Sequence, residues 1–212
     1  MFLNNSSLNL KGILSISFIL LIQLLYSQKT KIDSLKTELQ NHKTKDTTRV
    51  NILYDLAFAT FHIDEKLAKF YINEAEEISN NLNFIEGKAD VLFVKGILET
   101  RKSNYEISDK YLFKALDIYT KLKKEKGINS INNAIGVNYY RQALYKEALI
   151  YFNKSIAYNE KINNKFDLIS GLYNTGNIYA ETGEFEKAIS NYNRVIKLSK
   201  EVNHKTALTY AQ

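Results

Sequence analysis

The chain has 212 residues, of which 45% are hydrophobic and 25% are charged, as in a folded rather than a disordered protein. The absence of cysteine excludes disulfides, thiol catalysis, Fe–S clusters and thiolate metal sites. With no proline and only 8 glycines, the sequence has fewer turn residues than a β-sandwich or barrel of this length would need. The composition therefore favours helices joined by short loops.

A net charge of +6 raises the question of a nucleic-acid partner. Acidic and basic residues are interleaved, and the one dense basic run comprises Lys121, Lys123, Lys124 and Lys126. We interpret these lysines as facing the free carbonyl groups at a helix C-terminus just before Gly127. The alternative is a site for a polyanion, but we expect no nucleic-acid partner.

The segment 1–27 has the pattern of a secretory signal peptide. An apolar run without charge covers residues 12–26, Lys11 precedes it and Ser27 follows it. The run is shorter than the roughly 20 apolar residues that span a bilayer. We therefore expect export to the periplasm or the medium, with cleavage after Ser27. The alternative is an N-terminal membrane anchor that is not cleaved.

The sequence that follows is periodic. Gly96, Gly136 and Gly176 are evenly spaced and define a 40-residue period. Positions 68, 108, 148 and 188 are small at the same step, and positions 72, 112, 152 and 192 are large and apolar. Several columns that share one period without gaps indicate a solenoid of stacked units.

Each unit is predicted to form two antiparallel helices. In the third unit, apolar residues recur at helical spacing from Ile131 to Tyr140, a break follows near Gln142, and a second apolar face runs from Ala148 to Tyr158. Glycine within a helix costs about 1 kcal/mol relative to alanine. Its recurrence at one phase predicts that the two helix backbones approach closely there, beside the large residues at 112, 152 and 192. We expect an all-α fold, a right-handed superhelical solenoid of helical hairpins.

The predicted boundaries follow from this period. After the signal peptide (1–27), residues 28–47 form a capping helix and a loop, with Asp46 or Thr47 as the N-cap of the next helix. Four repeats fill residues 48–203, at about 48–88, 89–128, 129–168 and 169–203. Residues 204–212 read as the start of a fifth repeat, so we expect the chain to be a fragment of a longer protein.

The units resemble the tetratricopeptide repeat family over about residues 48–212, and the third and fourth units match its pattern most fully. The family pattern has a small residue in the first helix, then an aromatic residue, then an aromatic–x–x–Ala phrase that opens the second helix. The matching residues are Gly136, Tyr139, Tyr145 and Ala148, and then Gly176, Tyr179, Phe185 and Ala188. The period is longer than the family's usual length of about 34 residues, which resembles its long-repeat subgroup. The composition and the N-terminal pattern resemble those of exported proteins and sensor regions of Bacteroidetes-like bacteria.

The resemblance implies that the first helix of each unit lines a concave face on which peptides or helices dock. Carried over by position, it predicts these partner-binding residues: Phe93, Ile97, Arg101, Asn133, Val137, Tyr140, Arg141, Tyr173, Asn177 and Glu181. The alternative is that these residues form ordinary solvated helix surface.

Catalytic motifs are missing from the sequence, and His42, His62 and His204 lie in different units. We expect no enzyme activity, no cofactor and no metal site in this chain. The leading hypothesis is an exported protein–protein interaction scaffold for a peptide or protein partner. The alternative is the sensory N-terminal region of a longer membrane signalling protein, such as a histidine kinase or a transcription regulator. In that case a catalytic domain lies downstream, and contact with a membrane comes only through the signal sequence or a downstream segment.

Overall fold

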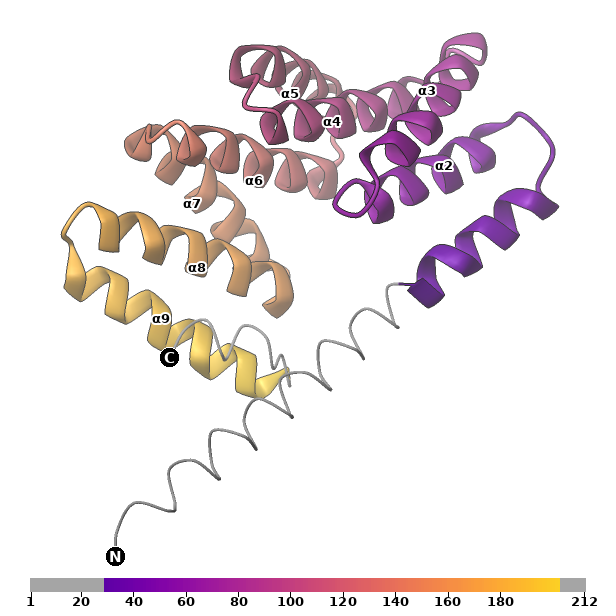
Figure 1. The fold of residues 1–212 in the computed structure, drawn as a ribbon. Helices are drawn as coiled ribbons and strands as arrows, with labels where there is room; N and C mark the ends of the chain where they lie inside the picture. Colours follow the sequence, from indigo (N-terminus) through magenta and orange to yellow (C-terminus); the bar gives the residue numbers. More distant parts are fainter. Residues whose placement is uncertain (1–28, 203–212) are drawn as a thin grey trace, which may run out of the picture. The chain divides into compact units, whose positions relative to one another are not determined.

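The computed structural model describes residues 29–202 (Figure 1). The predicted signal peptide (1–27) and the predicted start of a fifth repeat (204–212) lie outside the described residues. Within residues 29–202 the regular elements are all α-helices, which confirms the predicted fold class. Over the same range no helix is long and apolar enough to cross a membrane. The chain divides between Gly87 and Lys88 into two compact units.

The first unit contains a helix over residues 29–41, then α2 (Thr47–Thr60) and α3 (Glu65–Asn81). Helices α2 and α3 pack together as a hairpin. Asp46 is the N-cap of α2, as predicted, and its side chain accepts a hydrogen bond of 3.0 Å from the amide of Arg49. This bond, followed by that of the His42 ring, lowers the pKa of Asp46.

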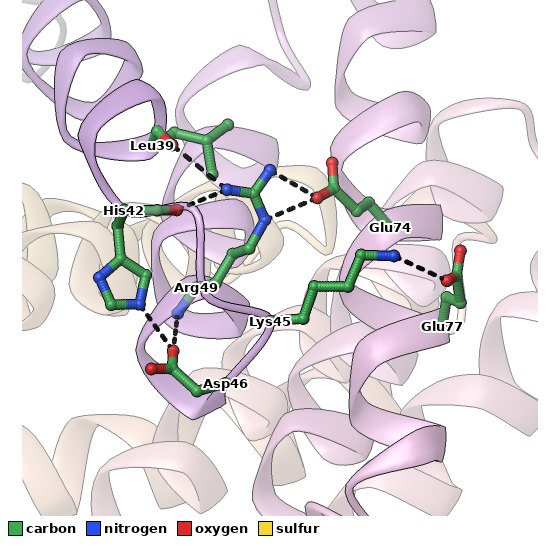
Figure 2. Close-up of polar contacts among 7 residues, drawn as sticks. All are labelled: Leu39, His42, Lys45, Asp46, Arg49, Glu74 and Glu77. Carbon is green, nitrogen blue, oxygen red and sulfur yellow. Dashed lines mark hydrogen bonds and ion pairs between the residues drawn. The ribbon is translucent and has the colours of Figure 1, made fainter.

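Arg49 ties the N-terminal helix to the first hairpin (Figure 2). Its Nε donates to Glu74 at 2.7 Å, and its Nη1 donates to the carbonyl oxygens of His42 at 2.6 Å and Leu39 at 3.2 Å. Carbonyl groups in the last turn of a helix have no partner within that helix. The guanidinium therefore caps residues 29–41 and anchors them to α3. This geometry fits the predicted capping helix.

The second unit continues with helices at a constant step. They are α4 (Ile85–Arg101), α5 (Tyr105–Lys121), α6 (Glu125–Arg141), α7 (Tyr145–Lys161), α8 (Lys165–Glu181) and α9 (Phe185–Glu201). These helices are equal in length, and the same short turn separates each from the next. They form the hairpins α6–α7 and α8–α9, and Figure 1 shows the last pair side by side. Helices α4 and α5 also pack as a hairpin, with Ser108 bonded to the carbonyl oxygen of Gly96. The first helices begin slightly earlier, at 85, 125 and 165, than the predicted repeat starts at 89, 129 and 169.

The interpretation of the basic run is wrong for two of its four lysines. Helix α5 ends at Lys121 and α6 begins at Glu125, so Lys124 and Lys126 lie at the start of a helix. Gly127 lies within α6 and does not end α5. A Cβ atom on Gly127 would lie 2.6 Å from ring atoms of Tyr119, so packing rather than helix termination explains this glycine.

The evenly spaced glycines meet the large residues predicted beside them. A Cβ atom would lie 2.6 Å from Leu112 at Gly96, 2.7 Å from Phe152 at Gly136 and 2.7 Å from Tyr192 at Gly176. These distances are shorter than van der Waals contact. The three glycines therefore have like environments, and each lets the second helix of its hairpin approach the first.

One turn closes six successive helices. The residue after each C-cap has a left-handed backbone, with φ between +52° and +79°, at Asn83, Ser103, Lys123, Ala143, Asn163 and Gly183. At the end of α6, the amide of Leu144 bonds the carbonyl of Tyr139 at 3.0 Å and that of Ala143 bonds the carbonyl of Tyr140 at 3.0 Å. This pair of bonds is the Schellman motif, and it recurs at the other five turns. Because the turn after each of these helices is identical, equivalent side chains stay in register.

We expect Ala143→Gly to stabilise the protein and Gly183→Ala to destabilise it. A left-handed backbone costs a non-glycine residue about 1 kcal/mol, and no atom lies within 4 Å of a Cβ placed on Gly183. The substitution Gly183→Ala should therefore lower the free energy of unfolding by about 1 kcal/mol, because of backbone conformation and not because of a clash. The gain at Ala143→Gly is smaller because glycine also gains freedom in the unfolded chain. Urea unfolding measures both, and equal midpoints for Gly183→Ala and wild type would contradict the assignment.

Candidate functional site

The predicted partner-binding residues lie on α4, α6 and α8, the first helices of the three hairpins in the second unit. We call this set the helix-A face. Ile97, Asn133, Val137, Tyr140, Tyr173 and Asn177 are half-buried, and Arg101, Arg141 and Glu181 are exposed. Phe93 is only 4% exposed, so its side chain belongs to the core.

Glu181 joins three helices at this face. Tyr140 on α6 donates a hydrogen bond of 2.6 Å to its Oε1, and Tyr145 at the start of α7 donates to its Oε2. The rings of the two tyrosines are 6.0 Å apart. Both carboxylate oxygens are therefore bonded within the protein, and they fix the two rings.

These hydrogen bonds determine the protonation states of Glu181, Tyr140 and Tyr145 at neutral pH. The hydroxyl of Tyr140, followed by that of Tyr145, lowers the pKa of Glu181. Burial, followed by the bond to Glu181, raises the pKa of Tyr140 well above its ordinary value. The bond to Glu181 is also the main cause that raises the pKa of Tyr145. At neutral pH Glu181 is therefore ionised and both tyrosines keep their protons.

Asn177 and Tyr173 are joined by a tyrosine of α9. Tyr192 donates a hydrogen bond of 2.7 Å to Oδ1 of Asn177, and its ring lies 6.1 Å from that of Tyr173. The same ring fills the space beside Gly176. The Nδ2 group of Asn177 has no partner among residues 29–202 and is available as a donor.

Arg101, Arg141 and Glu181 occupy equivalent positions, since each is the last residue of a first helix. The hydroxyl of Tyr105 lies 3.4 Å from the carbonyl oxygen of Arg141. The Arg141 side chain is exposed, and its guanidinium forms no ion pair within the described part of the chain. It is thus available to an anionic group.

A buried polar network behind this face was not predicted. Asn138 is fully buried, accepts a hydrogen bond of 2.9 Å from Thr100, and donates to Asp109 at 2.7 Å and to the carbonyl of Tyr105 at 3.2 Å. Ser108 donates to the carbonyl oxygen of Gly96 at 2.8 Å. The network links α4, α5 and α6 and fixes how the second and third hairpins stack.

The sequence reasoning also missed Tyr145 and Tyr192 as members of the site. Both lie on second helices, where their spacing predicts core packing. The recurring aromatic position at 105, 145 and 185 was the available signal for Tyr145. Across residues 29–202, no group of three or more His, Asp or Glu side chains is placed to hold a metal ion.

These hairpins, with a constant step and an aromatic and polar face on their first helices, define a helical-repeat protein. Residues 127–201 match the family model described as "Tetratricopeptide repeat". The third and fourth hairpins are therefore tetratricopeptide repeats, which confirms the resemblance found in the sequence. A fold of this family suggests a protein–protein interaction scaffold.

A curated relative and two solved structures agree with this assignment. A TPR repeat-containing protein of Methanocaldococcus jannaschii is 32% identical over 146 residues, which cover 68% of this chain and 22% of that protein. A Rap protein solved in complex with the Competence and Sporulation Factor is 23% identical, with a TM-score of 0.78 over 88% of this chain and 55% of that chain. A signal transduction ATPase with a tetratricopeptide repeat sensor, from Pyrococcus horikoshii, is 17% identical, with a TM-score of 0.69 over 90% of this chain and 30% of that chain. The two structures show likeness of fold.

We expect the double variant Tyr140→Phe/Tyr145→Phe to raise the pKa of Glu181 towards its ordinary value, because both bonds to the charged form are lost. In the wild type, the stabilisation from these bonds is present at neutral pH and is lost as the pH falls through the lowered pKa. A ¹³C NMR titration of the side-chain carboxyl measures the shift. Tyr179→Phe is the control, since this tyrosine lies on α8 but does not act on Glu181. An unchanged pKa in the double variant would refute the assignment.

Proposed function

We propose that the chain is a protein–protein interaction scaffold that holds a peptide or a helix of a partner on the helix-A face of its second unit. The observation that carries the proposal is the register of this face. The first helices α6 and α8 present half-buried aromatic and amide side chains, α4 presents the half-buried Ile97, and each of the three helices ends in a charged residue at the same position. Equivalent positions therefore recur along the face, as an extended partner requires, although their side chains differ from one hairpin to the next.

The chemistry of the face suits a peptide. An asparagine side chain both donates to and accepts from a peptide backbone, and an arginine fork pairs with a carboxylate. Tyr140 and Tyr145 are fixed by Glu181, so they lose little freedom when a partner binds. The guanidinium of Arg141, which has no ion pair among residues 29–202, favours a partner with an acidic residue near this end of the face.

The comparisons support a partner-binding role by analogy of fold. The Rap protein of similar fold was solved with a bound factor. The chain spans only 22% of the curated relative's length and 55% of the Rap chain's length. The activity and the partners of the whole protein are therefore part of this proposal.

The triple variant Arg101→Ala/Tyr140→Ala/Arg141→Ala tests the proposal. With the full chain as bait in an extract of its source cells, we expect partner proteins to be captured by the wild type and lost by the variant. The matched control Lys114→Ala/Asn153→Ala/Asn193→Ala changes exposed residues of the second helices and should capture the same partners. Equal capture by the triple variant, or no capture by the wild type, would count against the proposal.

A second candidate is the sensory region of a longer signalling protein. It is favoured by the similarity of fold to the signal transduction ATPase with a tetratricopeptide repeat sensor, of which this chain covers 30%. Reading the gene downstream decides between the two. A transmembrane helix followed by a kinase or DNA-binding module supports the sensor, and a stop codon soon after the next hairpin rules it out.

Export is also part of the proposal, because residues 12–26 are apolar and uncharged between Lys11 and Ser27. We expect a C-terminally tagged chain to appear in the periplasm or the medium, with a mass that matches cleavage after Ser27. Fractionation followed by mass spectrometry measures this. An intact chain in the membrane fraction would support the anchor, and an intact chain in the cytoplasm would refute both.

A further inference from the structure

A second group of side chains, apart from the helix-A face, lies where α5, α6 and α7 meet. The ring of Tyr151 on α7 lies 5.7 Å from that of Tyr139 on α6 and 6.1 Å from that of Phe113 on α5. Asp109 lies one turn before Phe113 on α5, and its Oδ1 accepts the bond from Asn138 at 2.7 Å. We call Asp109, Phe113, Tyr139, Glu147 and Tyr151 the aromatic site.

The carboxylates of this site act on its rings. Burial, followed by the negative charge of Asp109, raises the pKa of both Tyr139 and Tyr151. The negative charge of Glu147 also raises the pKa of Tyr139. Burial also raises the pKa of Asp109, against the bond from Asn138, which lowers it. Neither Asp109 nor Glu147 forms an ion pair with a cation within residues 29–202. The site thus combines aromatic faces with two carboxylates that form no ion pair within the described chain.

In the α8–α9 hairpin, the position equivalent to the aromatic site holds a cation against a tyrosine ring. Tyr179 is equivalent to Tyr139, and the ammonium of Lys187 lies 5.2 Å from its ring centre. The residue equivalent to Lys187 in the third hairpin is Glu147, so the chain supplies a carboxylate there instead of a cation. Lys154 lies 4.7 Å from the ring centre of Tyr151, so one face of the aromatic site already attracts an ammonium group.

We propose that the aromatic site binds a cationic side chain, an arginine of a peptide partner. A cation over an aromatic face is attracted by the ring, and more strongly where water is partly excluded. Arginine fits better than lysine because its planar guanidinium stacks on tyrosine and forks to a carboxylate. The site goes beyond the proposed function, since it shares no residue with the helix-A face and selects the opposite charge to Arg141.

The test uses two short peptides, acetyl-Gly-Arg-Gly-amide and the same peptide with citrulline, which keeps the shape of arginine without its charge. We expect the arginine peptide to cause saturable ¹H–¹⁵N NMR shifts at Asp109, Tyr139 and Tyr151 that weaken with added salt. The citrulline peptide should cause none. Equal shifts with both peptides would overturn the proposal.

Variants of the full chain make the test specific. Asp109→Asn keeps an acceptor for Asn138, and Glu147→Gln changes an exposed residue. Each variant should bind the arginine peptide about fivefold more weakly, which is the upper end of what a partly exposed ion pair contributes to affinity. Lys154→Ala should strengthen binding, because it removes the chain's own competing cation. Unchanged affinity in both carboxylate variants would overturn the site. The Arg101/Tyr140/Arg141 variant should bind the peptide as the wild type does, which separates this site from the helix-A face.

Discussion

The close approach of two helix backbones at a glycine is the contact on which each hairpin of the second unit depends. Glycine within a helix costs about 1 kcal/mol, but a Cβ atom placed 2.6 to 2.7 Å from a neighbouring side chain forces that side chain or the helix to move. Overpacking of this kind costs about 1–3 kcal/mol. Glycine is therefore the better residue at 96, 136 and 176. The space it leaves is filled by Leu112, Phe152 or Tyr192, so the same junction accepts side chains of different size.

The constant turn between helices makes the glycine contact recur in successive hairpins. Because the helices from α4 to α9 are equal in length and are joined by the same left-handed turn, equivalent side chains return to equivalent places. Polar contacts then cross from one hairpin to the next, as between Thr100 and Asn138, Tyr140 and Glu181, or Glu160 and Arg194. These contacts form only when the next hairpin is in place, as expected of a repeat whose units depend on their neighbours.

Features that follow from the 40-residue period and from local spacing could be predicted from the sequence. Features that depend on packing against a neighbouring hairpin could not. The hairpins, the packing of the evenly spaced glycines and the Asp46 cap each follow from local spacing, and the structure confirms them. Gly127 misled the assignment of a helix end because a glycine that makes room for a ring looks the same in sequence as one that ends a helix. Asn138 was missed because its equivalents, Leu98 and Ile178, are core residues. Phe93 has the spacing of a surface position, and its burial comes from tertiary packing that no single helix encodes.

Net charge is a poor guide to what this chain binds, because charges more than about 8 Å apart are screened at physiological salt. The local arrangement decides instead. On the helix-A face Glu181 keeps its negative charge while both its oxygens accept from tyrosine hydroxyls, and the guanidinium of Arg141 has no ion pair within residues 29–202, so an acidic group of a partner would pair with Arg141. At the aromatic site neither Asp109 nor Glu147 forms an ion pair within the described residues, so these carboxylates remain for a cation that competes with Lys154 over the ring of Tyr151. A polyanion such as nucleic acid would pair with Arg141 but would be repelled by Glu181 and by the carboxylates of the aromatic site. A peptide that carries both acidic and basic residues would satisfy both, which is a narrower requirement than the overall charge of +6 implies.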